Sequence, residues 1–159
     1  MSELINGART SFGRRTTEKK AACILPSSTP TKTMVVPFNY DSLPAVGDAE
    51  NDATYALIPA NAYIKSCHLY VETAFLGGTT YNIGLHQADG TVIDLDGLDA
   101  AVAVAAMTAN TWITSDGALV AADPGIGAAA AQVTIVATGT FTAGEGKLVI
   151  EYIEPDLIS

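Results

Sequence analysis

The sequence has few of the residues that build most metal and catalytic sites. It contains two histidines and two cysteines among 159 residues, and Cys23 and Cys67 lie far apart in the chain. With so few cysteines no disulfide framework is expected, and both thiols are expected to be free and at least partly buried. A zinc site at Cys67, His68 and His86 is not expected either, because neighbouring strand residues face opposite ways and structural zinc takes four ligands.

Basic residues are scarce beyond residue 32, which divides the chain by charge. Residues 1–32 carry six basic and two acidic residues, a net charge of +4, whereas residues 33–159 carry two basic and 15 acidic residues, a net charge of −13. An acidic body disfavours nucleic acid and anionic lipid as partners. We therefore expect a basic arm, 1–32, ahead of one body domain, 33–159.

Long apolar runs are also missing, although 48% of the residues are hydrophobic. No run approaches the roughly 20 residues that cross a bilayer, so a soluble protein without membrane contact is expected. The basic residues of the arm are not followed by the apolar segment of a secretory signal, which predicts synthesis in the cytosol. The arm is rich in serine and threonine, contains Pro26 and Pro30 and lacks a regular period, so we expect it to be extended or disordered in isolation.

The stretch 64–93 has the alternation that is typical of β-strands. Cys67, Leu69, Val71, Thr73 and Phe75 are predicted to face inward, and Ser66, His68, Tyr70 and Glu72 outward. The pairs Gly77-Gly78 and Asp89-Gly90 predict turns, with Ile83 and Leu85 inward on the strand between them. A β-meander is expected to organise the domain.

The flanking segments predict further strands and turns. Residues 33–40 should form a first strand that Pro37 ends at a sheet edge, and 53–58 a second strand before a turn at 58–62. Residues 100–107 are either a short helix capped by Asp99 or a strand with Val102 and Val104 alternating. Residues 111–120, which include the only tryptophan, suggest a hairpin, and 121–131 a loop of small residues. Residues 132–142 and 147–153 should pair across a Gly144-Glu145-Gly146 turn, with Val133, Ile135 and Ala137 on one face. The fold class is thus all-β, an antiparallel β-sandwich or jelly roll with an extended N-terminal arm.

Three groups of residues are candidate sites of chemistry. Asp94, Asp96 and Asp99 partly match a calcium loop, but the twelfth position of an EF-hand is Ala105 here, which favours a solvated acidic loop. Ser66 and Ser115 lack a nucleophile-elbow context, and the glycine pairs join strands rather than opening a helix for phosphate. We therefore predict no enzyme, no catalytic residue, no metal and no cofactor.

Three segments carry a resemblance to a known group of proteins. They are Val71-Glu72-Thr73-Ala74-Phe75 with Gly77-Gly78-Thr79-Thr80, Asp89-Gly90-Thr91-Val92-Ile93-Asp94, and Thr138-Gly139-Thr140-Phe141-Thr142-Ala143-Gly144-Glu145. Over about residues 55–153 the chain resembles capsid cement or decoration proteins of tailed bacteriophages, of jelly-roll type. The resemblance implies a homotrimer on the outer surface of the virion, synthesised in the host cytoplasm, that fastens neighbouring subunits of the major capsid protein.

In that interpretation the arm is the fastener. Its basic residues would meet acidic groups of the capsid, and its short apolar segment would fill a recess, which is how a flexible arm can cover a large surface. The predicted partner-binding residues are Arg9, Arg14, Arg15, Lys19, Lys20, Ile24 and Leu25. Two alternatives stay open: a head-fibre or tail-fibre module that binds a host surface glycan, and a cytosolic enzyme.

Overall fold

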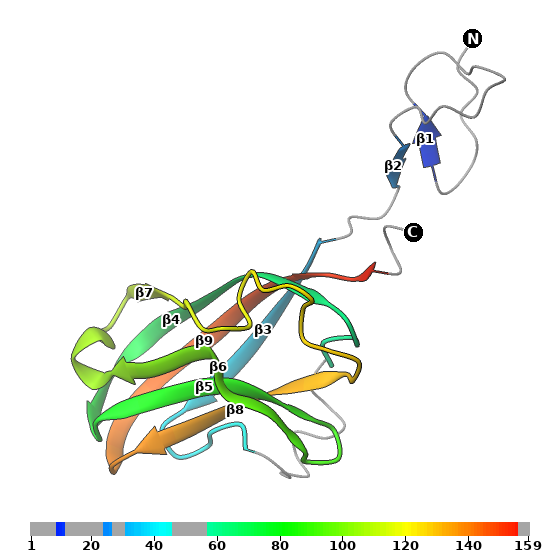
Figure 1. Ribbon diagram of the computed structural model, residues 1–159. Helices are drawn as coiled ribbons and strands as arrows, with labels where there is room; N and C mark the ends of the chain where they lie inside the picture. The colour runs from blue at the N-terminus through cyan, green and yellow to red at the C-terminus, as the bar shows by residue number, and fades with distance from the viewer. Residues whose placement is uncertain (1–8, 12–23, 27–30, 46–56, 156–159) are drawn as a thin grey trace, which may run out of the picture.

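The computed structural model describes residues 9–11, 24–26, 31–45 and 57–155, and strands make up most of these residues (Figure 1). Seven strands make a sandwich of two antiparallel sheets, and a short 3-10 turn, η1 (Val104–Ala106), lies between two of them. The seven strands are β3 (Thr31–Asn39), β4 (Tyr63–Gly77), β5 (Thr80–Gln87), β6 (Val92–Ala103), β7 (Thr111–Thr114), β8 (Ala131–Thr138) and β9 (Phe141–Ile153). The predicted all-β sandwich is confirmed. Among the described residues, no helix has the length and apolarity of a membrane span.

The four-stranded sheet has the order β3-β9-β4-β7. Its alternation follows the sequence: Leu148, Ile150 and Tyr152 of β9 are buried, as are the predicted inward residues of β4 with one exception. Thr73 is exposed, because the register of β4 against β9 shifts on both sides of it and turns its side chain outward. β3 is an edge strand, as Pro37 predicted, but it continues past Pro37 to Asn39.

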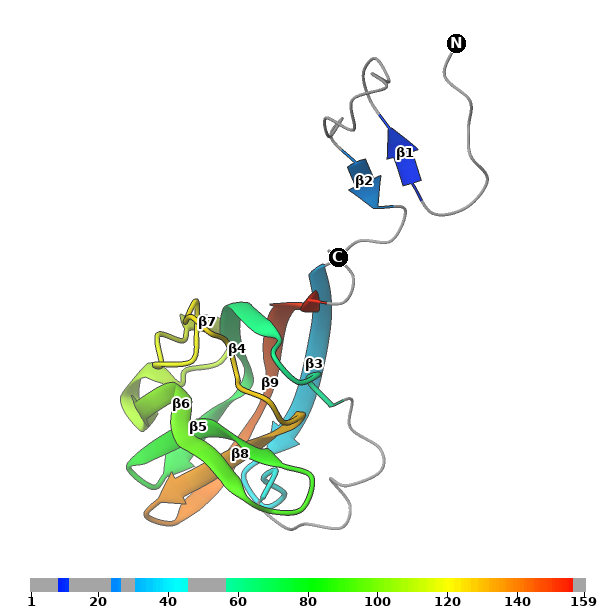
Figure 2. The same ribbon diagram turned by 45° about the vertical axis from the view of Figure 1, so that its right-hand side comes forward.

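The three-stranded sheet has the order β6-β5-β8 and closes the sandwich (Figure 2). Ile83 and Leu85 of β5 are buried as predicted. The ambiguous stretch 100–107 is resolved as the end of strand β6 followed by η1. Residues 111–120 are not a hairpin, because β7 pairs with β4 and Val120 makes only an isolated parallel bridge to Ile64. Of the second predicted strand, 53–56 lie outside the described residues, and Ile58 makes only an isolated bridge to Ala131.

One two-stranded ribbon bends from the first sheet into the second. β4 pairs with β9 up to Gly77 and Phe141, and β5 pairs with β8 from Thr80 and Thr138 onward. The segment β4–β5 and the segment β8–β9 therefore pass from one sheet to the other side by side. Gly77 and Gly78 take φ values of +74° and +53° at this corner, which confirms the predicted turn.

The predicted closing hairpin is wrong in two respects. β8 and β9 are joined at Gly139-Thr140 and belong to different sheets, and Gly144-Glu145-Gly146 lies inside β9. The glycine at 144 is required by packing rather than by a turn, because a Cβ there would overlap the ring of Phe75. Ala137, predicted to face inward with Val133 and Ile135, is exposed.

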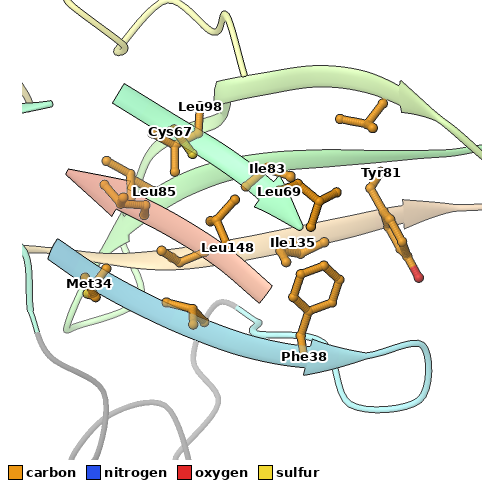
Figure 3. Packing of buried hydrophobic residues seen from close by; sticks show 14 of the residues in the cluster. Met34, Phe38, Cys67, Leu69, Tyr81, Ile83, Leu85, Leu98, Ile135 and Leu148 are labelled. Carbon is orange, nitrogen blue, oxygen red and sulfur yellow. The ribbon is translucent and has the colours of Figure 1, made fainter. Parts of the chain in front are cut away.

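Aliphatic and aromatic side chains from both sheets fill the interior. Figure 3 shows Leu69, Ile83, Ile135 and Leu148 pointing into the space between the sheets. At one end, four rings from three sequence-distant regions pack together: Phe38, Phe75, Tyr81 and Phe141. This aromatic cluster ties the bent ribbon to the edge strand β3.

Candidate partner-binding surface

The predicted arm residues fall partly on two short strands. Arg9 is on β1 (Arg9–Ser11), and Ile24 and Leu25 are on β2 (Ile24–Pro26). These strands pair antiparallel, with Arg9 opposite Pro26 and Ser11 opposite Ile24, a pairing that the sequence did not predict. In both views the β1–β2 pair lies beyond the end of the sandwich where β3 begins (Figures 1 and 2). The other four predicted residues, Arg14, Arg15, Lys19 and Lys20, lie outside the described residues.

The three aspartates that partly match a calcium loop do not converge on one point. They belong to β6 rather than to a solvated loop, and Asp99 is buried. The Asp96 N–H donates to Asp94 Oδ1 at 3.3 Å, and the proximity of Asp94 raises the pKa of the Asp96 carboxyl. Among the described residues, no three histidine, cysteine, aspartate or glutamate side chains come together to hold a metal ion.

The other candidate residues also lie apart. Cys67 is buried and free, whereas His68 is on the opposite face of β4, as the alternation predicted. His86 is buried on β5, with its Nδ1 2.7 Å from the Gln87 carbonyl. Ser66 is on the outer face, where its hydroxyl donates to Glu151 Oε2 at 3.2 Å. Ser115, in contrast, is buried, so the two serines lie on different sides of the sheet and cannot form one catalytic site.

A small polar group lies inside the sandwich where β7 ends. It consists of Cys67, Asp99 and Ser115, and the Ser115 N–H donates to the Cys67 carbonyl at 3.0 Å. Burial raises the pKa of the Cys67 thiol to about 12, and burial also raises the pKa of the Asp99 carboxyl. The nearby Ser115 hydroxyl has a smaller effect, which lowers the pKa of both groups. Such a thiol stays protonated and poorly nucleophilic at neutral pH, so this group is structural.

The outer face of the four-stranded sheet carries an exposed group of rings. Register places Tyr70 of β4 beside Trp112 of β7, and His68 is two residues earlier on the same face of β4. The Tyr70 and Trp112 ring centroids are 4.7 Å apart with planes tilted by 35°, and the His68 ring meets Trp112 edge-on at 6.5 Å. Trp112 keeps 59% of its surface exposed. We call His68, Tyr70 and Trp112 the aromatic patch.

Hydrogen-bonding groups border the aromatic patch. Lys147 of β9 lies opposite Tyr70 in the register and forms an ion pair with Glu72 at 2.5 Å. The hydrogen bond and the charge of Glu72 raise the pKa of the Lys147 ammonium. On the other side, the Tyr70 hydroxyl donates to Asn110 Oδ1 at 3.3 Å. The surface is thus a group of rings, centred on the exposed Trp112, with amide, carboxylate and ammonium groups at its margin.

The sequence predicts the part of this surface that lies on β4. The outward orientation of His68, Tyr70 and Glu72 follows from the alternation of β4 and is confirmed. Trp112 was missed as their partner, because the pairing of β7 with β4 joins segments about 40 residues apart. A local signal was present in Thr111-Trp112-Ile113-Thr114, where alternation with Ile113 inward turns Trp112 outward.

Comparison with known proteins gives likenesses of fold. No protein-family profile matches the chain, and no curated protein sequence is significantly similar to it. A chain of the cyanophage Pam1 capsid asymmetric unit matches with a TM-score of 0.52 and 15% sequence identity, over 89% of this chain and 98% of that chain. A chain in the capsid of Ralstonia phage GP4 matches with a TM-score of 0.46 and 16% identity, over 82% of this chain and 88% of that one. The chain therefore shares its fold, over nearly its whole length, with a chain of the Pam1 capsid structure.

Proposed function

We propose that the protein is a structural protein of a tailed-phage virion that decorates and cements the outer surface of the capsid. The observation that carries the proposal is the fold likeness to a chain of the cyanophage Pam1 capsid, which covers 89% of this chain. That likeness agrees with the sequence resemblance to capsid decoration proteins over residues 55–153. In this role the protein is not an enzyme, and its work is to bury surface between subunits.

The division of charge supports an attachment through the arm. Residues 1–32 have a net charge of +4 and the body a net charge of −13, so an acidic recess on the major capsid protein would attract the arm and repel the body. The β1–β2 pair lies apart from the sandwich in both views, which leaves it free to reach a neighbouring subunit (Figures 1 and 2). The sandwich then sits outside, as a trimer that bridges neighbouring capsomers.

Co-sedimentation with capsids of the same phage tests this function. The full-length protein should sediment with capsids, and a variant without residues 1–30 should stay in the supernatant while keeping the urea midpoint of its body. The core strands begin at Thr31, so this deletion removes no residue of the sandwich. Light scattering of the free and attached protein tests the trimer. A full-length protein that never sediments with capsids contradicts the proposed function, and a deletion variant that still sediments contradicts the role of the arm.

A further inference from the structure

The aromatic patch exposes side chains that folded proteins normally cover. Tryptophan is highly buried on average, yet Trp112 is 59% exposed and supports Tyr70 at a centroid distance of 4.7 Å. Tyr70 is itself half-buried, held by Lys147 on one side and by Asn110 at its hydroxyl. The rings are therefore held in place before any partner arrives, which lowers the entropy that binding must overcome.

The charges around the patch argue against an anionic ligand. Within residues 31–45 and 57–155 each of the three lysines has a glutamate partner: Lys32 with Glu154 at 4.0 Å, Lys65 with Glu151 at 3.7 Å, and Lys147 with Glu72 at 2.5 Å. This part of the chain thus offers no unpaired lysine to an anion, on a body whose net charge is −13. An anion is therefore disfavoured, and Glu72 beside the patch is already neutralised by Lys147, so a neutral ligand suits the patch best.

The ion pair between Lys147 and Glu72, beside the patch, argues against a protein partner. The centre of a stable protein interface is depleted of charged residues, because each one must lose its water. Here Lys147 and Glu72 border Tyr70 directly, in the middle strands of the sheet rather than at its rim. A ligand that brings many hydroxyl groups can hydrogen-bond to these charges without leaving them dry and unpaired.

We propose that the aromatic patch is a binding site for a neutral saccharide. One hexopyranose ring stacks its apolar C–H face on Trp112 and the edge of Tyr70. Its hydroxyl groups donate to Glu72 and to the Asn110 carbonyl oxygen, and its oxygens accept from the Lys147 ammonium. The site lies on the body and does not depend on the arm or on a capsid, so it goes beyond the proposed virion role and can fail or stand independently of it.

The single tryptophan of the chain reports on the site directly. Maltohexaose, cellohexaose and fully N-acetylated chitohexaose are titrated separately to about 10 mM, the affinity range of a single exposed platform. They cover two linkages, α-1,4 and β-1,4, and two neutral sugar units, glucose and N-acetylglucosamine. At least one should change the Trp112 emission in a saturable manner. Since the ligand is neutral, the midpoint should be the same at low and high salt.

Calorimetric titration of variants completes the test, because Trp112→Ala removes the fluorescent reporter. Trp112→Ala should weaken binding of the same oligosaccharide by more than about tenfold, whereas Trp112→Phe, which keeps a ring face, should retain most of it. The matched control is Val136→Ala, an exposed residue of β8 on the other sheet, which should bind normally. Equal urea midpoints show that the variants are folded.

Two outcomes overturn the proposal. The first is that none of the three oligosaccharides binds. If the Trp112 emission then shifts on self-association or on attachment to capsids, the patch is a protein interface instead. The second is that Trp112→Ala binds as well as the unchanged protein.

Discussion

Tyr81 and Phe141 stack face to face, with ring centroids 4.2 Å apart and an angle of 11° between their planes. The two residues come from different sheets, Tyr81 from β5 and Phe141 from β9, at the corner where the bent ribbon passes between the sheets. Phe75 meets both rings edge-on, at 5.3 Å and 6.2 Å. Burial of this cluster is what holds the corner of the sandwich closed.

The Tyr81 hydroxyl is the weak point of this cluster. It is buried without a hydrogen-bond partner, and burial raises the pKa of the phenol to about 12. A buried unsatisfied polar group costs about 1 to 3 kcal/mol, so Tyr81→Phe should raise the free energy of unfolding by about 1 kcal/mol. Urea denaturation measures the change, with Tyr40→Phe as the control because Tyr40 is 39% exposed. A fall in stability for Tyr81→Phe would show that the hydroxyl has a partner after all.

A comparison of Gly144 with Gly127 separates the cost of steric overlap in β9 from the cost of backbone strain. Both have positive φ, +137° and +93°, but a Cβ at 144 would overlap the Phe75 ring, whereas a Cβ at 127 would meet nothing within 4 Å. Gly127→Ala should cost about 1 kcal/mol of backbone strain. Gly144→Ala should cost about 3 kcal/mol or more, because overpacking adds to the strain. Equal losses in thermal or urea unfolding would mean that Phe75 moves aside freely.

Asp99 should make stability depend on pH. Burial, followed by the charge of Asp116, raises its pKa in the folded protein above the ordinary value near 3.9. The folded state then holds this proton more tightly than the unfolded state, so the contribution is complete below the ordinary pKa and is lost as pH rises through the raised value. Asp99→Asn keeps a neutral side chain at every pH. It should therefore gain stability relative to the unchanged protein between pH 3 and pH 7, as measured by urea denaturation at both values.

Asp116→Asn is the control for the Asp99 experiment. It removes the smaller charge effect and leaves the burial of Asp99 in place, so its gain between the two pH values should be smaller. If Asp99→Asn shows the same pH profile as the unchanged protein, then Asp99 is hydrated in solution and its burial is not what sets its proton affinity.

Local pattern predicted the strands well because the period of a strand is a local property. The inward residues Cys67, Leu69 and Val71 follow from alternation alone, and a turn at Gly77-Gly78 follows from the backbone freedom of glycine. Thr73 departs from the pattern because a register shift against β9 is a property of two strands and cannot be seen in one.

Partner choice between strands was harder to predict. The motif Gly144-Glu145-Gly146 looks like a turn, yet its first glycine is required because the Phe75 ring, about 70 residues earlier, leaves no room for a Cβ. Likewise Trp112 lies next to Tyr70 only because β7 adds to the edge of β4. The Gly144–Phe75 and Trp112–Tyr70 contacts both join residues far apart in the sequence, so a local pattern cannot predict them. The aromatic patch depends on the second contact.

The arm is expected to contact the capsid through two kinds of side chain, charged and apolar, and these should differ in strength. Exposed charge pairs contribute roughly 0.2 to 1 kcal/mol each, whereas burial of a leucine or isoleucine contributes about 1.5 to 3 kcal/mol. Changing Ile24 and Leu25 to serine should therefore weaken attachment to capsids more than changing Arg14 and Arg15 to serine. Co-sedimentation at increasing protein concentration gives the two affinities.

Salt separates the two contributions further. Screening weakens exposed charge pairs and leaves apolar burial nearly unchanged, so the loss caused by the arginine changes should shrink between about 0.1 M and 1 M salt, and the loss caused by the Ile24 and Leu25 changes should persist. If the arginine pair dominates even at high salt, the arm is held by desolvated charge pairs rather than by its apolar segment. If neither pair of changes weakens attachment, the sandwich itself binds the capsid and the arm is not the fastener.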